Sequence, residues 1–263
     1  MLRLRPGYIR TFIVFLMLAG FLAGGCAGPQ VQPDDADSKK SARLKFQEAL
    51  NFGKLNMKEE MVATLLEVVS LAPENLNYRM HLGNAYVLND EVENGEKTYQ
   101  AILDKDKDYK PALLELGRLA MRRGNWKQAT HYFNEILSRP GTPMPHQVYN
   151  YLAISYYRMG MYPEAEGEWL KALAIKEYAP IRLNLALAYR DQERFQEARA
   201  SLEKAIDLDP KLAQAHYEIA ILYLKESWNQ KAEKHFNEVL RLAPQSQWAQ
   251  SSREYLKVMQ TGS

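Results

Sequence analysis

The feature that most restricts the fold of this chain is a residue pattern that returns about every 34 residues between residues 42 and 246. Each clear copy has a large aliphatic residue, then a small residue, and then a tyrosine three positions further on. Examples are Leu152-Ala153-x-x-Tyr156, Leu185-Ala186-x-x-Tyr189 and Ile219-Ala220-x-x-Tyr223. A small residue lets a paired helix approach closely, and large residues at helical spacing fill the seam between the two helices. Each copy is therefore predicted to be a pair of antiparallel helices.

Prolines mark where the copies end. Six copies are expected at 42–75, 76–109, 110–143, 146–178, 179–212 and 213–246. Pro73, Pro210 and Pro244 end the second helix of their copies, because proline cannot continue a helix. The first copy is degenerate and has Met61 where a small residue normally sits. The proline-rich stretch 139–145 is predicted to be a rigid break between copies three and four.

The repeated residues resemble the tetratricopeptide-repeat (TPR) family over about residues 42–260. The resemblance implies an all-α fold, a right-handed TPR superhelix (α-solenoid) of six helix-turn-helix repeats plus a C-terminal capping helix. Residues 247–263 are assigned to the capping helix and a tail, because an uncapped last repeat would expose its apolar flank. TPR arrays bind a protein or peptide partner on the concave face that their first helices line.

The N-terminus has the pattern of an export signal. Arg3, Arg5 and Arg10 precede an apolar run that is shorter than the ~20 residues of a membrane-spanning helix, so residues 1–25 are assigned to a lipoprotein signal peptide. The small residues directly before Cys26 resemble the bacterial lipobox, which implies that Cys26 carries a lipid. The alternative is a soluble export signal that merely contains a cysteine. Residues 26–41 are polar and contain two prolines, so they are expected to form a lipid-anchored flexible tether.

Composition argues against several functional classes. The net charge of +2 includes the three N-terminal arginines, and the nearly neutral remainder argues against a nucleic-acid partner. The five histidines lack the paired spacings of a metal site, and the single cysteine cannot form a cysteine-based metal cluster. The sequence contains no phosphate-binding loop or nucleophile motif. The chain is therefore predicted to be no enzyme, with no catalytic residue, no metal, no cofactor and no small-molecule substrate.

The TPR resemblance also implies which residues face the concave groove. The implied partner-binding residues are Asn77, Met80, Asn84, Arg118, Met121, Arg122, Asn150, Tyr157, Arg158, Leu187, Arg190, Tyr217 and Leu224. Apolar side chains rimmed by basic residues are the composition expected of a peptide-binding groove. The asparagines would hold the backbone of the partner, and the methionines would adapt to its side chains. For any single apolar residue, packing on an adjacent helix is an equally good interpretation.

An export signal, a lipid anchor and six repeats together resemble the PilF/PilW group of type IV pilus pilotin lipoproteins. The resemblance implies a lipoprotein anchored at the periplasmic face of the outer membrane. Its partner would be a secretin subunit, and its role would be to assist secretin localisation and assembly. Ala27, directly after the cysteine, is no inner-membrane retention signal. The alternative is a TPR adaptor lipoprotein of another envelope machine, such as outer-membrane protein assembly, peptidoglycan hydrolase recruitment or polysaccharide export.

Overall fold

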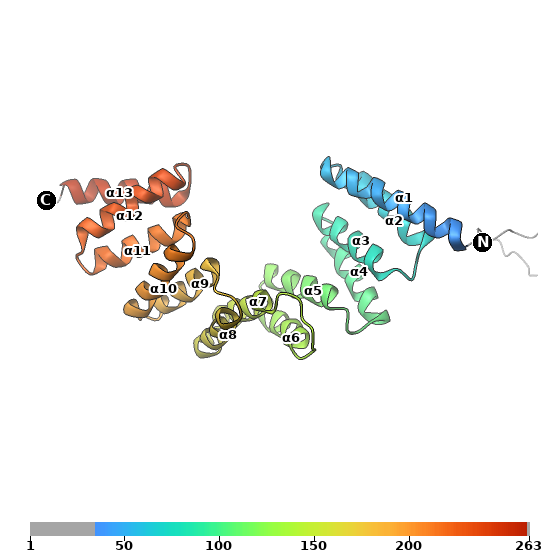
Figure 1. The fold of residues 1–263 in the computed structure, drawn as a ribbon, viewed down its shortest axis with the longest axis horizontal. Helices are drawn as coiled ribbons and strands as arrows, with labels where there is room; N and C mark the ends of the chain where they lie inside the picture. The colour runs from blue at the N-terminus through green and yellow to red at the C-terminus, as the bar shows by residue number, and fades with distance from the viewer. Residues whose placement is uncertain (1–34, 262–263) are drawn as a thin grey trace, which may run out of the picture.

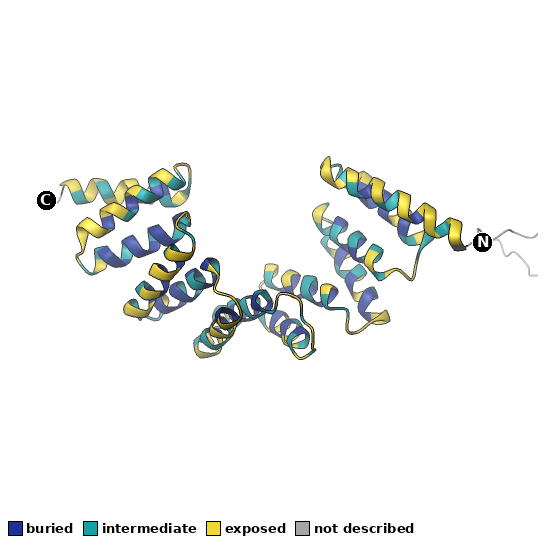
Figure 2. Ribbon diagram, in the orientation of Figure 1, coloured by how far each residue is buried: buried dark blue, intermediate teal, exposed yellow. Residues whose placement is uncertain are grey.

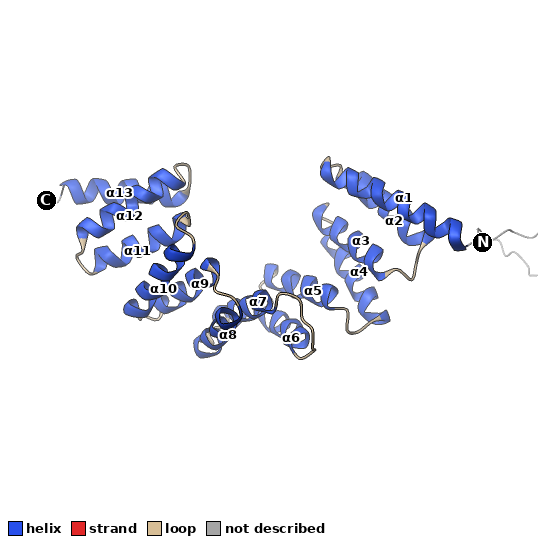
Figure 3. Ribbon diagram, viewed as in Figure 1, coloured by secondary structure: helices blue, strands red, loops and turns tan. Residues whose placement is uncertain are grey.

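The computed structural model describes residues 35–261, which form thirteen helices and no strand (Figure 3). Successive helices pair in chain order, so six helix pairs are followed by one last helix. The helices are α1 (Asp35–Lys54), α2 (Lys58–Leu71), α3 (Leu76–Leu88), α4 (Val92–Lys105), α5 (Lys110–Arg122), α6 (Trp126–Leu137), α7 (Pro145–Arg158), α8 (Tyr162–Ile175), α9 (Ala179–Asp191), α10 (Phe195–Leu208), α11 (Ala213–Lys225), α12 (Asn229–Leu242) and α13 (Gln247–Thr261).

The helix pairs stack into an open arc, with α1 at one end of the array and α13 at the other (Figure 1). In the middle of the array α5, α7 and α9 lie on the inner side of the arc, whereas α6, α8 and α10 lie on the outer side. The first helix of each of these pairs therefore lines the concave face. No helix among residues 35–261 is long and apolar enough to cross a membrane.

Small residues on the first helices receive aromatic rings from the second helices. A Cβ atom added to Gly83 would lie 2.5 Å from the ring of Tyr99, and one added to Gly117 would lie 2.6 Å from the ring of Phe133. Both rings are fully buried, and buried residues follow the seam between paired helices throughout the array (Figure 2). Close approach at the small residue thus makes the space that the ring of the paired helix fills.

The turn inside every helix pair has the same backbone geometry. One residue in each turn has a positive φ between 58° and 76°; these residues are Asn56, Asp90, Gly124, Gly160, Glu193 and Ser227. The N–H of the next residue then donates to a carbonyl five residues earlier, at 2.8–3.0 Å, as in Glu91 to Tyr86 and Trp228 to Tyr223. This left-handed cap satisfies carbonyl groups that a helix end leaves without partners. It repeats even where the left-handed residue is not glycine.

The proline-rich break between α6 and α7 is anchored by side chains. Arg139 donates to the carbonyl of Lys107 at 2.6 Å and pairs with Glu135 at 2.6 Å. The Thr142 hydroxyl donates to the carbonyl of Ile136 at 2.9 Å. These contacts fix the connection against repeat 3 and against the preceding inter-repeat loop.

The last helix, α13, covers the apolar flank of repeat 6. Ala249 and Ser252 are fully buried, and the Tyr255 ring stacks on Phe236 with centroids 5.3 Å apart and planes 5° apart. Met259 also packs against this core. The helix therefore buries surface that a seventh repeat would otherwise cover.

The first helix begins earlier than the sequence predicted. We expected a tether up to residue 41 and a first repeat from residue 42, but α1 starts at Asp35 and buries Ala42 completely. Acidic residues are favourable in the first turn of a helix, so the polar segment continues the helix N-terminally although it packs little apolar surface. The expected signal peptide, Cys26 and the first part of the expected tether lie outside the described residues.

Candidate partner-binding site

The thirteen implied groove residues all lie on first helices of the pairs. They are divided among α3 (Asn77, Met80, Asn84), α5 (Arg118, Met121, Arg122), α7 (Asn150, Tyr157, Arg158), α9 (Leu187, Arg190) and α11 (Tyr217, Leu224). Three features of this surface differ from the sequence-based expectation: the exposure of one methionine, the bonding of two asparagines and the partners of one arginine.

Met80 is not available to a partner. Its side chain is only 8% exposed and belongs to the buried cluster that also contains Tyr99 and Leu113. Met121 is half-buried and packs against the same cluster. Apolar residues at helical spacing serve the seam between repeats as readily as the groove, and at Met80 the seam accounts for the residue.

The asparagine oxygens are used inside the protein. Asn84 accepts a hydrogen bond from the Tyr99 hydroxyl at 2.7 Å, and Asn150 accepts one from the Trp169 indole at 2.9 Å. Asn150 also accepts from the Asn184 amide at 3.1 Å. Both oxygens thus satisfy polar groups of large buried rings, which otherwise lack a partner. An amide oxygen accepts two hydrogen bonds, so the Asn150 oxygen has none left for a partner backbone, which corrects the sequence-based expectation at this residue, whereas Asn84 keeps one.

Arg190 is part of a side-chain network that joins repeats 4, 5 and 6. Its guanidinium donates to Asp191 at 2.8 Å and pairs with Glu218, which is 7% exposed. Asp191 also accepts a hydrogen bond from the Tyr157 hydroxyl across the boundary between two repeats. We predicted Arg190 as a rim charge free to meet a partner, but two carboxylates of its own chain already neutralise it.

The pKa values in this network follow from burial and from these hydrogen bonds. Burial raises the pKa of Glu218, against the opposing effect of the Arg190 charge. Burial and the hydrogen bond to Asp191 raise the pKa of Tyr157 to about 12. Burial acts to raise the pKa of Asp191 as well, but the hydrogen bonds from Tyr157 and Arg190 outweigh it and lower that pKa.

The basic side chains on α5 and α7 are more accessible to solvent than Arg190. Arg118 contacts Glu115 at 3.0 Å and is half exposed, while Arg122 and Arg158 are exposed. The Arg158 guanidinium lies 5.9 Å from the centroid of the Trp126 ring. This part of the concave face can present guanidinium groups to a partner.

The C-terminal part of the groove offers half-buried apolar side chains. Leu187, Tyr217 and Leu224 all pack against the core of repeats 4–6 while part of each remains exposed. The Tyr217 ring lies 6.1 Å from Phe236. Such partly buried, well-supported rings and aliphatic chains are the usual anchors of a protein interface.

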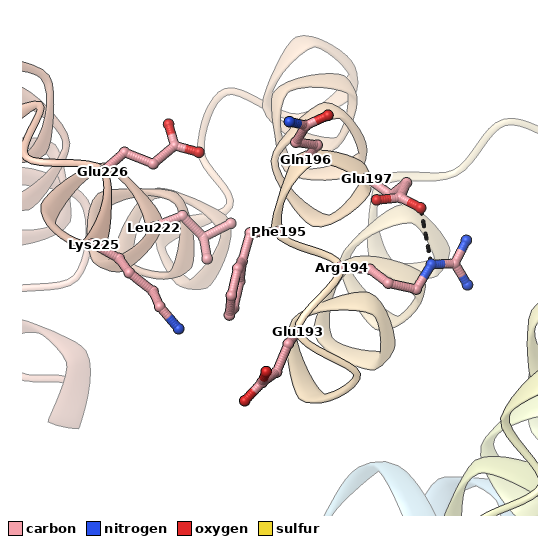
Figure 4. Close-up of a pocket in the computed structure, with 8 residues that line it drawn as sticks. All are labelled: Glu193, Arg194, Phe195, Gln196, Glu197, Leu222, Lys225 and Glu226. Atoms are coloured by element: carbon pink, nitrogen blue, oxygen red, sulfur yellow. Dashed lines mark hydrogen bonds and ion pairs between the residues drawn. The ribbon is translucent and has the colours of Figure 1, made fainter.

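A depression of about 510 Å³ lies between repeats 5 and 6, where α9 turns into α10 beside the end of α11 (Figure 4). Phe195 and Leu222 form its apolar surface, and the Lys225 ammonium lies 3.6 Å from the centroid of the Phe195 ring. Arg194, which also lines it, hydrogen-bonds Glu197 at 2.9 Å. Sequence reasoning did not single out this depression. The available signal was an aromatic residue at the start of several second helices, as at Trp126, Tyr162 and Phe195.

Two histidines contact each other outside the groove. The Nδ1 atoms of His216 and His235 are 2.9 Å apart, and His216 Nε2 donates to the Pro210 carbonyl at 3.1 Å. His216 Nδ1 is then the acceptor and His235 Nδ1 the donor, because neutral imidazole carries one N–H. Within residues 35–261 no group of three or more histidine, cysteine, aspartate or glutamate residues could hold a metal ion.

Comparison with protein-family models decides the repeat type. Models of the tetratricopeptide repeat match residues 114–180 and 213–246, and a TPR-repeat model matches residues 186–226. The chain carries tetratricopeptide repeats. The thirteen described helices accordingly form an all-α TPR superhelix, as the sequence predicted.

Solved TPR structures share the arrangement of the whole array. PilF of Pseudomonas aeruginosa is 15% identical, with a TM-score of 0.69, and the match covers 84% of this chain and 99% of PilF. PilW, described as a widely conserved type IV pilus biogenesis factor, is 17% identical with a TM-score of 0.71, covering 80% of this chain and 97% of PilW. A TPR protein of Parabacteroides merdae is 17% identical with a TM-score of 0.69, covering 84% and 88%. At these identities the likeness establishes the fold.

A curated relative matches part of the chain. The homologue of BBSome complex member BBS4 of Drosophila melanogaster is 28% identical over 139 residues, which are 49% of this chain. The match spans only 28% of the length of that relative.

Taken with the repeat matches and the solved structures, this TPR chain is a protein-interaction scaffold that resembles pilus biogenesis factors in fold.

Proposed function

We propose that this TPR chain is an outer-membrane pilotin, anchored through a lipid on Cys26, that binds a secretin subunit of a type IV pilus and assists its localisation and assembly. The observation that carries the proposal is the extent of the structural match: it covers 99% of PilF and 97% of PilW. The likeness therefore extends over nearly the whole length of both pilus proteins.

The N-terminal sequence supports the same proposal. Arginines, an apolar run and the small residues before Cys26 fit export followed by lipid attachment. Several acyl chains on one residue would hold the chain at a bilayer far more firmly than a single chain can. The first helix of the array would then start a short distance from the membrane surface, within reach of a membrane-inserting partner.

The concave face supports a binding role with no chemistry of its own. Its exposed parts combine guanidinium groups on α5 and α7 with half-buried apolar side chains on α9 and α11. Apolar anchors dominate binding at such surfaces, while charges at the edge set association rate and specificity. Binding, and not catalysis, is the function that this arrangement serves best.

The anchor is tested by replacing Cys26 with Ser in cells that make the pilus. We expect Cys26→Ser to release the chain from membranes or to leave an uncleaved precursor, and secretin multimers to fall while monomers accumulate. Fractionation, labelled-palmitate incorporation and immunoblotting of the secretin measure these outcomes. Equal palmitate labelling of the variant would reject the lipid site, and normal secretin multimers in a strain without the chain would reject the pilotin role.

The groove is tested with Tyr217→Ala, which removes a half-buried ring from α11. Loss of such an anchor is expected to cost ~2 kcal/mol of binding free energy for the secretin subunit. Leu170→Ala is the matched control, because Leu170 is 48% exposed but lies on α8 at the outer side of the arc. Calorimetric titration of both purified variants, with circular dichroism to confirm folding, separates the two. Equal binding by both would move the site away from the concave face.

A further inference from the structure

The arginines of α5 and α7 carry an excess of positive charge on the concave face. Arg118 and Arg122 are one helical turn apart on α5, and Arg158 is the last residue of α7. Among the described residues, these three guanidinium groups form a single ion pair, which joins Arg118 to Glu115. Arg122 and Arg158 are exposed, so their charges face solvent or a partner.

The corresponding surface of α9 and α11 has no excess of positive charge, because Asp191 and Glu218 offset Arg190 and Lys225. Asp191 ends α9 at the position where α5, α7 and α11 end in a basic residue. A carboxylate at a helix C-terminus is unfavourable against the helix dipole, so local helix preference does not explain it. The hydrogen bonds of Asp191 with Tyr157 and Arg190 explain why a carboxylate is found there. Arg190 in turn pairs with Glu218. Asp191 and Glu218 therefore pair with the Arg190 guanidinium, and Lys225 at the end of α11 is the cation of this surface that they leave unpaired.

We infer that the concave face is divided by charge: α5 and α7 bind the acidic residues of a partner segment, and α9 and α11 bind its uncharged apolar residues. The inference rests on the proposed function in one respect, namely that the concave face is where the partner binds. Next to the neutralised network, Leu187, Ile221 and Leu224 keep part of their apolar surface exposed. A carboxylate placed there would have to compete with Asp191 and Glu218 for Arg190.

Acidic peptide is the partner chemistry that fits this division. Guanidinium groups bind carboxylates through paired hydrogen bonds, with geometry that an ammonium group does not supply. A long uniform polyanion would gain less along α9, where Arg190 is already paired with Asp191 and Glu218. The segment expected is therefore a protein segment with aspartate or glutamate at one end and large apolar residues at the other.

The proposed division of the groove by charge can be tested without a purified partner. A phage library of random peptides is selected for binding to the folded chain that starts at residue 27. Peptides selected by the unaltered chain should combine acidic with aromatic or aliphatic residues. A variant with Arg118→Gln, Arg122→Gln and Arg158→Gln should select apolar peptides without the acidic residues. The matched control replaces three exposed cations of second helices, Lys127, Lys204 and Lys234, by Gln and should keep the acidic selection.

Arg190→Gln sharpens the test, because the inference holds that this arginine is already neutralised. The Arg190→Gln variant should therefore still select peptides with acidic residues. Calorimetric titration of one selected acidic peptide should show about fivefold weaker binding to the triple arginine variant at low salt, and a smaller difference at high salt. The control variant should bind that peptide as the unaltered chain does.

Three results would overturn the inference: selected peptides without acidic residues, acidic selection that survives the triple arginine change, or acidic selection lost equally in the lysine control. Failure here is distinguishable from failure of the pilotin proposal. A chain that selects acidic, apolar peptides but leaves secretin assembly unaffected would keep the divided groove and lose the pilotin role. A chain required for secretin multimers that shows no acidic selection would do the reverse.

Discussion

Repeats 4–6 and repeats 1–2 share one fold but are held together by different side chains. In repeats 4–6 a continuous buried cluster contains the large rings of Trp169, Tyr189, Tyr223 and Phe236. The buried cluster of repeat 1 and α3 consists of apolar side chains without rings, such as Leu65, with Phe46 and Tyr86 only partly buried against it. The buried Tyr99 ring of repeat 2 belongs to the next cluster along the array. The same backbone geometry therefore carries seams of unequal size.

Ion pairs between neighbouring repeats occur in both regions, so the buried clusters carry the difference. Near the N-terminus Lys105 pairs with Glu74 at 2.7 Å, across repeats 2 and 1. Arg194 pairs with Glu166 at 2.6 Å, across repeats 5 and 4, and Arg199 pairs with Glu226 at 2.5 Å, across repeats 5 and 6. Each is partly exposed and stabilises little by itself. In an array whose stability is a sum of repeat and seam contributions, the comparison teaches that opening should begin at the N-terminal repeats and reach repeats 4–6 last.

The largest expected effect comes from emptying the aromatic core. Trp169→Ala should lower the free energy of unfolding by ~4 kcal/mol, because it leaves a large cavity and removes the indole that bonds to Asn150. Leu65→Ala, the matched change in repeats 1–2, should cost ~3 kcal/mol and open those repeats alone. Urea unfolding with hydrogen exchange measures both. A smaller loss for Trp169→Ala than for Leu65→Ala would break the comparison.

A second effect depends on pH and concerns repeat 6. Burial, together with the charges of His216 and Lys234, lowers the pKa of His235 to about 4. A histidine with a lowered folded pKa binds its proton less readily when folded, so stability is lost as pH falls from 6.5 towards about 4. The loss attributable to His235 should be ~2 kcal/mol after allowance for partial exposure. His235→Gln should remove that part of the pH dependence and leave the part that comes from the carboxylates. The free energy of unfolding is measured against pH for both chains, and identical curves for the unaltered chain and the variant would contradict the prediction.

The smallest expected effect concerns the left-handed turn residue. Gly160→Ala in repeat 4 should cost ~1 kcal/mol, because alanine is strained at a φ of 76°. Asn56→Ala, at a φ of 58° in repeat 1, should cost less, since both residues there carry a Cβ atom. Thermal unfolding monitored by circular dichroism measures the two changes. A larger loss for Asn56→Ala than for Gly160→Ala would contradict the expected order of the two turns.

Sequence periodicity was sufficient to predict the helix pairs and their order, and the resemblance to the TPR family implied the superhelix. The pairing of a small residue with a large ring, as at Gly83 and Tyr99, recurs in the residue pattern and could be read from the sequence. The groove was harder, because the partners of Arg190 come from residues one and twenty-eight positions away, on the same helix and on the next repeat. Those contacts depend on the angle between neighbouring repeats, which no single repeat encodes.

The error at Met80 has the same physical origin. A position on the first helix can face either the groove or the seam with the paired helix and the following repeat, and at Met80 the packing with Tyr99 and Leu113 places the side chain in the seam. The early start of α1 has a different cause. Its first residues are polar and show no apolar periodicity, so the helix extends on local preference where the pattern ends.

The stacking of Tyr255 on Phe236 also bears on how such an array can change in length. Because α13 occupies the flank of repeat 6, a further copy added after α13 would find that flank already covered. Growth or shrinkage by whole copies would have to take place inside the array, between seams that still match. The closing helix thus acts as a terminator for duplication of the repeat, and it fixes how long a partner segment the concave face can span.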